Sequence, residues 1–170
     1  LIDRGANVKA IDDTHHTPLH LATNQETAEL LIDAGADVNA KTKRTGEISL
    51  YSAARNAAQG AQKSYQVYLD LTKMLIVKGA DVNVKLKSGS MIEDNKPHHA
   101  KSGETALHAV VRSYSEKHAS EVCELLIANG AKVNELNVKG QTPLDEALAN
   151  GRNKTAGILR KHGGRTGEQI

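Results

Sequence analysis

The stretch LLIDAGADVNA, at residues 30–40, recurs along this chain of 170 residues. Related segments are LIDRGANVKA (1–10), MLIVKGADVNV (74–84), LLIANGAKVNE (125–135) and ILRKHGGRTGE (158–168). Each segment has apolar residues that suit the end of a helix, followed by a glycine, which can adopt a positive φ and end that helix. Recurrence at intervals of a few tens of residues indicates a repeat architecture.

A second set of segments precedes the last four copies: HTPLHLA (16–22), EISLYSA (47–53), ETALHAV (104–110) and QTPLDEA (141–147). Threonine is a good helix cap, and proline is tolerated in the first turn of a helix. The order is therefore a short first helix, an apolar second helix and a glycine-containing loop. This pattern resembles the ankyrin repeat, and the resemblance covers nearly the whole chain.

The resemblance implies an all-α ankyrin-repeat solenoid, in which stacked helix-turn-helix units carry β-hairpin fingers. We expect a single domain over residues 1–170. Its predicted parts are a partial repeat (1–11), a repeat (12–43), a repeat with long helices (44–87), a repeat preceded by a long finger insertion (88–137) and a C-terminal capping repeat (138–170). The closing segment also resembles the end of bacterial ankyrin arrays, so we expect the C-terminal part of a bacterial array.

The spacing of the repeats is irregular. The glycines at positions 5, 35, 79, 130 and 163 are separated by 30, 44, 51 and 33 residues, whereas the ankyrin period is about 33. The intervals predict a clipped turn near residues 23–25, lengthened helices around 56–68 and a lengthened finger over 84–103. Insertions in these places lie on the rim and leave the stack intact.

Leucine stands four residues before each of these glycines, and we expect these leucines in the shared core. Isoleucine follows it in every copy except the last, where Arg160 indicates a polar end of the stack. The valines of the loops are expected in the seam between fingers and helices, and the following asparagines are expected to bond the turn of the neighbouring finger. These residues are Val38, Val82 and Val133, then Asn39, Asn83 and Asn134.

The composition limits both the core and the partners. The chain has no Phe or Trp and only four Tyr, so Leu, Ala, Ile and Val must fill the core. A net charge of +2 gives no strong field to recruit nucleic acid or a membrane. Cys123 is the one cysteine, which fits a reducing compartment, and we expect a cytoplasmic protein.

The histidines are candidates for chemistry. His20 and His108 occupy one position of the repeat, but Tyr51 and Asp145 occupy it in the other copies, so a shared catalytic role is implausible. The resemblance implies that they bond the backbone of their own and the adjacent repeat. Cys123 suits a small core residue better than a nucleophile. No nucleophile elbow, phosphate-binding loop or zinc-protease motif is present, and we expect no enzyme.

Metal binding is the other chemistry considered. The histidine pairs at 15–16 and 98–99, with Glu93 and Asp94, are metal-ligand types on fingers. Adjacent residues seldom converge on one ion, and the four-ligand spacing of known sites is missing. Solvated loop histidines are the preferred interpretation, with no metal and no cofactor.

Recognition of another protein is the predicted function. The resemblance implies contacts from the finger tips and from the exposed ends of the first helices. The matching residues are Asp13, Thr14, His16, Arg44, Thr45, Glu47, Arg55, Asn56, Lys101, Ser102, Glu104, Arg112, Ser113, Lys139 and Gln141. The basic residues among them, with neighbouring lysines, form a stripe that we expect to bind an acidic protein surface or peptide.

Three alternatives remain open. The charges could be ordinary solubilising residues, the stripe could meet the phosphates of nucleic acid, or the array could pack against another domain of its own chain as an intramolecular scaffold. Nucleic acid is less favoured because the tyrosines, which could stack on bases, do not lie on the fingers. We expect a monomer with no membrane partner.

Overall fold

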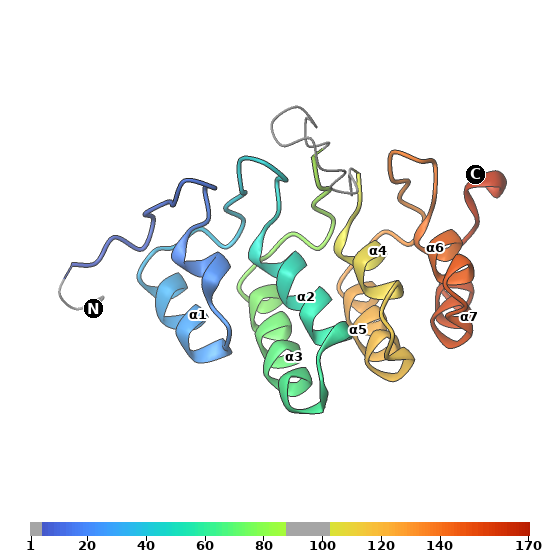
Figure 1. The fold of residues 1–170 in the computed structure, drawn as a ribbon, viewed down its shortest axis with the longest axis horizontal. Coiled ribbons are helices and arrows are strands. Elements are labelled where there is room, and N and C mark those ends of the chain that lie inside the picture. The colour runs from blue at the N-terminus through green and yellow to red at the C-terminus, as the bar shows by residue number, and fades with distance from the viewer. Residues whose placement is uncertain (1–4, 88–102) are drawn as a thin grey trace.

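The computed structural model describes residues 5–87 and 103–170, and within them the chain forms helix pairs stacked side by side (Figure 1). The predicted all-α array of stacked helices is confirmed. The elements are η2 (Pro18–Leu21), α1 (Gln25–Asp33), α2 (Ser49–Gln59), α3 (Gln62–Val77), α4 (Ala106–Val111), α5 (Glu116–Ala128), α6 (Pro143–Ala149), α7 (Asn153–Lys161) and η3 (Gly167–Gln169).

The helices form two layers. The first helix of each pair contacts the first helix of the next, so η2, α2, α4 and α6 form one row. The second helices α1, α3, α5 and α7 form the other row, again through successive contacts. Finger loops project from one side of the stack (Figure 1). The division into repeats at the predicted boundaries stays a prediction.

The helix ends follow from local chemistry. Pro18 and Pro143 stand in the first turns of η2 and α6, where no intrahelical partner is lost. The glycines that follow α1, α3 and α5 have φ values of 92°, 91° and 86°. These are left-handed conformations, which side chains with a Cβ adopt only with strain, so Gly35, Gly79 and Gly130 release the chain into the fingers.

The pairs differ in length as the spacing predicts. The first helix η2 has only 4 residues, and α1 begins after a short turn, whereas α2 has 11 and α3 has 16. The α2–α3 pair therefore extends beyond its neighbours on the side opposite the fingers (Figure 1). The predicted finger insertion falls largely on residues 88–102, which lie outside the described residues.

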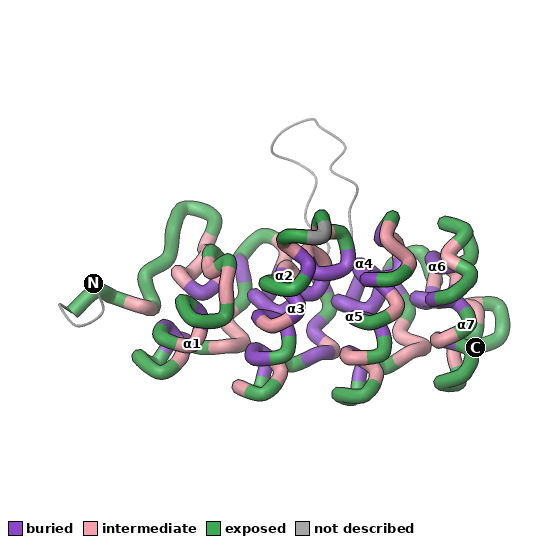
Figure 2. The backbone as a smooth tube through the Cα atoms, turned by 90° about the horizontal axis from the view of Figure 1, so that it is seen from below, coloured by how far each residue is buried: buried purple, intermediate pink, exposed green. Residues whose placement is uncertain are grey.

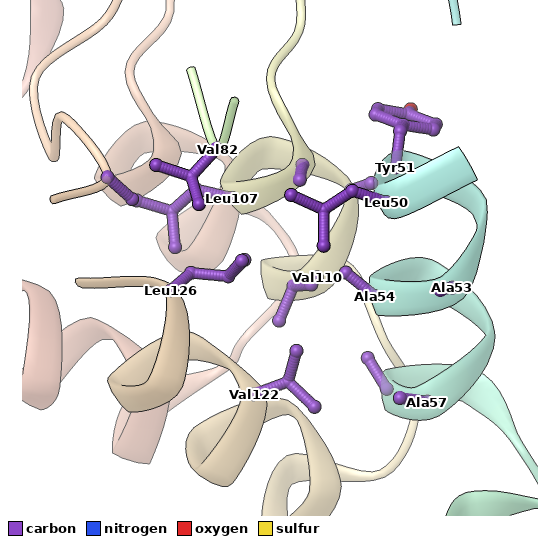
Figure 3. Packing of buried hydrophobic residues seen from close by; sticks show 14 of the residues in the cluster. Leu50, Tyr51, Ala53, Ala54, Ala57, Val82, Leu107, Val110, Val122 and Leu126 are labelled. Carbon is purple, nitrogen blue, oxygen red and sulfur yellow. The ribbon is translucent and has the colours of Figure 1, made fainter. Parts of the chain in front are cut away.

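The core lies between the layers and between the pairs (Figure 2). Leu75, Leu126 and Leu159 are fully buried and Leu31 nearly so, which confirms the expected leucine seam. Small residues let the helices approach closely. Ala54 and Ala57 of α2 face valines of α4 and α5 (Figure 3). At the last pair Arg160 is exposed, as expected for a polar end.

One aromatic contact joins the second-helix row. The ring of Tyr65 on α3 stacks on His118 of α5 with centroids 3.8 Å apart and planes inclined by 8°. The Tyr65 hydroxyl also donates a hydrogen bond to Glu121. Burial, followed by this bond and the nearby carboxylate charge, raises the pKa of the Tyr65 phenol. This contact joins α3 to α5 in addition to the buried aliphatic residues of α3.

The fingers differ from the predicted β-hairpins, because the described residues contain no strand. In the second finger the N–H of Thr42 donates to the carbonyl of Glu47 at 3.0 Å. In the last, the N–H of Asn137 donates to Gln141 at 2.9 Å. Such isolated bonds close a loop, but they are too few to form a ladder.

Asparagine side chains tie successive fingers together. Asn83 donates from Nδ2 to the carbonyl of Gly130 at 3.0 Å and accepts at Oδ1 from the N–H of Lys132 at 2.9 Å. Asn39 and Asn134 make the same pair of bonds one repeat earlier and one repeat later. The expected role of these asparagines is confirmed. Val82 is buried in the seam, and Val38 and Val133 pack partly against it.

We expect Asn83→Ala to lower the free energy of unfolding by about 1–2 kcal/mol, because two backbone groups lose their partners. Urea denaturation followed by circular dichroism measures the change. Asn83→Asp keeps the acceptor and loses the donor, so it is expected to lie between the wild type and Asn83→Ala. A stability of Asn83→Ala equal to that of the wild type would contradict the inter-finger role.

Candidate functional site

His20 and His108, each in the first turn of a first helix, are architectural residues. Nδ1 of His108 lies 3.2 Å from the backbone N of Thr105, which donates to it, and 3.0 Å from Thr105 Oγ1. Since Nδ1 accepts, Nε2 carries the proton, and it donates to the carbonyl of Gln141 at 3.2 Å in the next finger. His20 makes the same set of contacts, with Thr17 and with the carbonyl of Glu47.

Both histidines are held in the neutral form. Burial is the largest cause that lowers the pKa of His20 and of His108, and the hydrogen bonds to the carbonyls only partly oppose it. A protonated ring would also lose the acceptor that caps the helix. The architectural interpretation of these residues is therefore supported by both geometry and charge.

The other two repeats have Asp145 and Tyr51 at this position, and these side chains also make hydrogen bonds. Asp145 Oδ2 accepts from the N–H of Thr142 and from the N–H of Gly167, each at 2.8 Å. Burial raises the pKa of the Asp145 carboxyl, but these backbone donors bring it below its ordinary value. Tyr51 instead reaches forward, and its hydroxyl lies 3.4 Å from Oε2 of Glu104.

Glu104 belongs to a polar network that runs across the first-helix row. Arg112 donates to the Glu104 carboxylate from both terminal guanidinium nitrogens, Nη1 and Nη2, each at 2.7 Å. Nη1 also lies 2.8 Å from Oε2 of Glu146. Asn137 donates from Nδ2 to Oε1 of Glu146 at 3.0 Å. The chain Tyr51–Glu104–Arg112–Glu146–Asn137, called here the polar network, thus joins α2, α4, α6 and two fingers.

The polar network holds one guanidinium against two carboxylates that are almost removed from water. The side chains of Glu104 and Glu146 are each 8% exposed, and that of Arg112 is 24% exposed. Burial is the largest cause that raises the pKa of the Glu146 carboxyl. The charge of Arg112 lowers this pKa and the charge of Glu104 raises it, and the pKa stays above its ordinary value. Burial alone would lower the pKa of Arg112, but the bond to Glu104 and the charges of both carboxylates raise it.

This network uses residues that the sequence assigned to a partner. Arg112 and Glu104 bind each other through two hydrogen bonds, whereas Arg55 on α2 lies over the Tyr51 ring. Ser113 is fully buried and donates to the carbonyl of Ala58 at 2.5 Å. Glu104 and Ser113 present no exposed side chain, and we remove both from the candidate contact set.

Arg112 is half-buried but binds Glu104 and Glu146, and the other members of the set differ in exposure. Asp13 and Thr14 on the first finger, Arg44 on the second and Lys139 on the last are exposed. His16, Thr45, Glu47, Arg55, Asn56 and Gln141 are half-buried. The structure does not bring the four fingers to one point, since each is held beside its own helix pair (Figure 1). Lys101 and Ser102 lie outside the described residues.

The first finger is organised around Asp12. Its carboxylate accepts from the N–H of Thr14 at 2.9 Å, from the Thr14 hydroxyl at 2.7 Å and from the N–H of His16 at 2.8 Å. The Thr14 hydroxyl bond is the largest cause that brings the pKa of Asp12 down to about 2. His16 also contacts the Thr14 side chain. Asp12 and Thr14 therefore shape this finger before any partner arrives.

Sequence reasoning missed the roles of Tyr51, Glu146 and Asn137. One signal was present, because Tyr51 replaces histidine at a position where the side chain bonds the next finger. A tyrosine there is longer and reaches a side chain instead of a carbonyl. Glu146 and Asn137 carried no such signal, since their partners come from a different repeat.

Metal-ligand groups and membrane-spanning helices were both sought in the part of the chain that the structure describes. No group of three or more His, Cys, Asp and Glu side chains that could hold a metal ion gathers there, and the pair His15–His16 belongs to no such group. No helix in residues 5–87 and 103–170 is long and apolar enough to cross a membrane. The pair at 98–99, with Glu93 and Asp94, falls outside these residues.

Cys123 is buried, and burial raises the pKa of its thiol to about 12, so it stays protonated.

Acidification is expected to destabilise the fold below about pH 6.5. The folded pKa values of His20 and His108 lie below the unfolded value, so the unfolded chain binds protons first, and stability falls as pH drops through that value. Urea midpoints at pH 7.5 and 5.5 measure this effect. The double variant His20→Gln and His108→Gln is expected to be less stable at pH 7.5 but less sensitive to pH. An undiminished pH dependence would contradict the assignment.

Removing Arg112 is expected to cost about 3–5 kcal/mol, because it leaves two buried carboxylates facing each other. The triple variant Arg112→Met, Glu104→Gln and Glu146→Gln removes all three charges and is expected to recover much of the loss of Arg112→Met. Arg55→Met serves as the control, because Arg55 only lies over the Tyr51 ring at 5.9 Å. Equal costs for Arg55→Met and Arg112→Met would contradict the role of the polar network.

Comparison with known proteins agrees with this architecture. Residues 56–169 match the family model described as ankyrin repeats in three copies, and residues 14–43 match the model of the single ankyrin repeat. Ankyrin repeats are typical protein–protein interaction modules and are generally non-catalytic.

Two similar proteins come from vertebrates. The nuclear factor NF-kappa-B p105 subunit of Gallus gallus is 31% identical over 89% of this chain and 17% of its own length. The ankyrin repeat and SOCS box protein 16 of Homo sapiens is 31% identical over 97% of this chain and 33% of its own length. The chain thus spans at most a third of these relatives. Nothing in them supports the predicted bacterial origin or the prediction of a C-terminal part.

The family assignment rests on agreement between these matches, the stacked helix pairs and the asparagine and histidine bonds between successive fingers. The chain belongs to the ankyrin repeat family.

Proposed function

We propose that this ankyrin array is a non-enzymatic module that binds an acidic segment of another protein on its fingers and first helices. The proposed contacts are the exposed and half-buried members of the candidate set that the polar network does not use: Asp13, Thr14, His16, Arg44, Thr45, Glu47, Arg55, Asn56, Lys139 and Gln141. A cytoplasmic location belongs to the same proposal and rests on the single cysteine.

The observation that carries the proposal is the gathering of basic side chains on two neighbouring fingers. Lys41, Lys43 and Arg44 are exposed on the second finger, and Lys87 is exposed on the third. These four residues are called here the basic finger surface. Within residues 40–47 and 84–87 only one carboxylate, that of Glu47, accompanies them and Lys85.

The two fingers are joined to each other. The N–H of Lys87 donates to the carbonyl of Thr45 at 2.7 Å. The stem of Lys87 lies over Gly46 so closely that a Cβ there would approach Lys87 Cγ to 3.0 Å. Lys87 can therefore cover the second finger with its methylene groups while its ammonium group stays in water. The basic finger surface is one surface rather than two.

The neighbouring lysine is differently engaged. Lys85 pairs with Glu135 at 2.5 Å and donates to the carbonyl of Leu136 at 3.2 Å, so it links the third finger to the fourth. For this reason Lys85 is left out of the basic finger surface.

Carboxylates lie on the second-helix row as well as on the fingers. Glu26 and Asp33 are exposed on α1, and Glu121 and Glu124 on α5. Asp33 also accepts from Lys78 across two repeats at 2.8 Å. The second helices carry lysines as well, so the positive charge of the basic finger surface is a local feature of the two fingers. Such a local cluster favours encounter with an acidic partner.

Selection from a displayed peptide library tests the proposal. We expect enriched peptides to be acidic and their affinity to fall with salt, because exposed charges are screened over about 8 Å at physiological ionic strength. The variant Lys43→Glu with Lys87→Glu is expected to weaken the best peptide by about tenfold or more, measured by fluorescence anisotropy.

The matched control is Lys73→Glu with Lys161→Glu, which makes the same change in net charge at exposed positions of α3 and α7. It is expected to leave affinity almost unchanged. Basic or uncharged peptides among the hits, or equal losses for both double variants, would overturn the proposal. Tighter binding of a single-stranded oligonucleotide than of any peptide would favour the nucleic-acid alternative instead.

A further inference from the structure

A cleft of about 250 Å³ lies between the first two described helix pairs. One wall comes from the end of η2 and the turn that follows it. The other comes from one face of α2 and from α3. The lining residues that matter below are Leu21, Thr23, Ala53, Asn56, Tyr68 and Leu71.

The cleft results from the mismatch in helix length. The chain leaves η2 after Leu21 and enters α1 at Gln25, whereas α2 continues to Gln59. The part of α2 around Ala53 and Asn56 therefore faces a turn instead of a full neighbouring helix. On its other side α2 is covered by α4 and α5 (Figure 3). An ordinary pair of neighbouring repeats would fill this space with helix.

The walls combine apolar surface with unused polar groups. Leu71 and Ala53 supply a buried apolar floor, and Leu21, at 66% exposed, forms an apolar edge. Among the described residues, no hydrogen bond involves the Asn56 amide, the Tyr68 hydroxyl or the Thr23 hydroxyl. Convergent free polar groups over an apolar floor are typical of a binding site.

We propose that the cleft binds one apolar side chain of an extended protein segment, whose backbone amide bonds Asn56. The inference rests on the proposed function and names a contact for the same partner. The volume is below the ~300–1,000 Å³ of small-molecule sites, so it suits a single side chain such as leucine or methionine. The Asn56 amide can both donate and accept, which matches the N–H and C=O of an extended chain.

The surroundings favour a segment that carries carboxylates next to this apolar residue. Arg55 immediately precedes Asn56 on α2. The second finger, with Lys41 and Lys43, precedes α2 directly in the chain. An acidic segment on the basic finger surface can thus continue toward the cleft. The apolar side chain would act as the buried anchor, and the charges would steer it.

The test uses a neutral probe, so that finger charges do not contribute. N-acetyl-L-leucine N-methylamide is titrated into the ¹⁵N-labelled chain, and N-acetylglycine N-methylamide serves as the comparison. We expect the leucine compound to shift the backbone signals of Ala53 and Asn56 and the side-chain amide of Asn56. The glycine compound, which lacks a side chain, is expected to leave them nearly unshifted.

Asn56→Ala is expected to weaken the leucine compound about fivefold, since it removes the amide bonds and retains the apolar floor. Asn153→Ala, an exposed asparagine at the start of α7, is the matched control and is expected to bind as the wild type does. The comparison of the two probes on the wild type does not depend on the folding of either variant.

Equal shifts from both probes, or shifts that avoid the cleft, would overturn this inference. If acidic peptides bind while the cleft signals stay unmoved, the inference fails and the proposed function stands. If the leucine compound shifts the cleft while no acidic peptide binds, the proposed function fails and the cleft remains a site for an apolar side chain.

Discussion

The structure depends on contact between neighbouring helix pairs, because no pair can bury its own apolar face. Leu75, Leu126 and Leu159 are fully buried only because the adjacent pair covers them. Such an array is stabilised by each pair and by each interface in turn, so its cohesion is local and sequential. The absence of Phe and Trp follows the same constraint, since thin layers leave little room for large rings. Alanine and valine bring the layers together instead.

Polar bonds set the register of this apolar stack. Apolar contacts between the leucines are non-directional, whereas the bonds from Asn83 to the next finger and from His108 to the next carbonyl require one spacing. The polar network extends that specification across the first helices. A buried polar group of this network would be destabilising if it had no partner, and in the observed geometry each carboxylate has one. The face that this family offers to partners is therefore partly occupied by the fold itself.

Because the fold and the proposed partner use the same face, some of the predicted site residues are exposed and others are buried. Residues on finger tips, such as Arg44 and Lys139, are exposed because loops lie at the surface. Residues at the ends of first helices are different, since equivalent positions meet different neighbours. Arg55 lies over a tyrosine ring, whereas Arg112 meets two carboxylates from its own finger and the next helix. No inspection of a single repeat distinguishes them.

The sequence by itself determined the family, the order of helices, the glycine ends, the asparagine bonds and the unequal helix lengths. Each of these depends on residues close in the chain or on a pattern that recurs. Tertiary structure alone decided the burial of Glu104 and Ser113, the polar network and the cleft beside Asn56. The physical reason is that these features arise at interfaces between unlike repeats. Whether a side chain or a helix is long enough to meet its neighbour there depends on both repeats, and no local pattern encodes it.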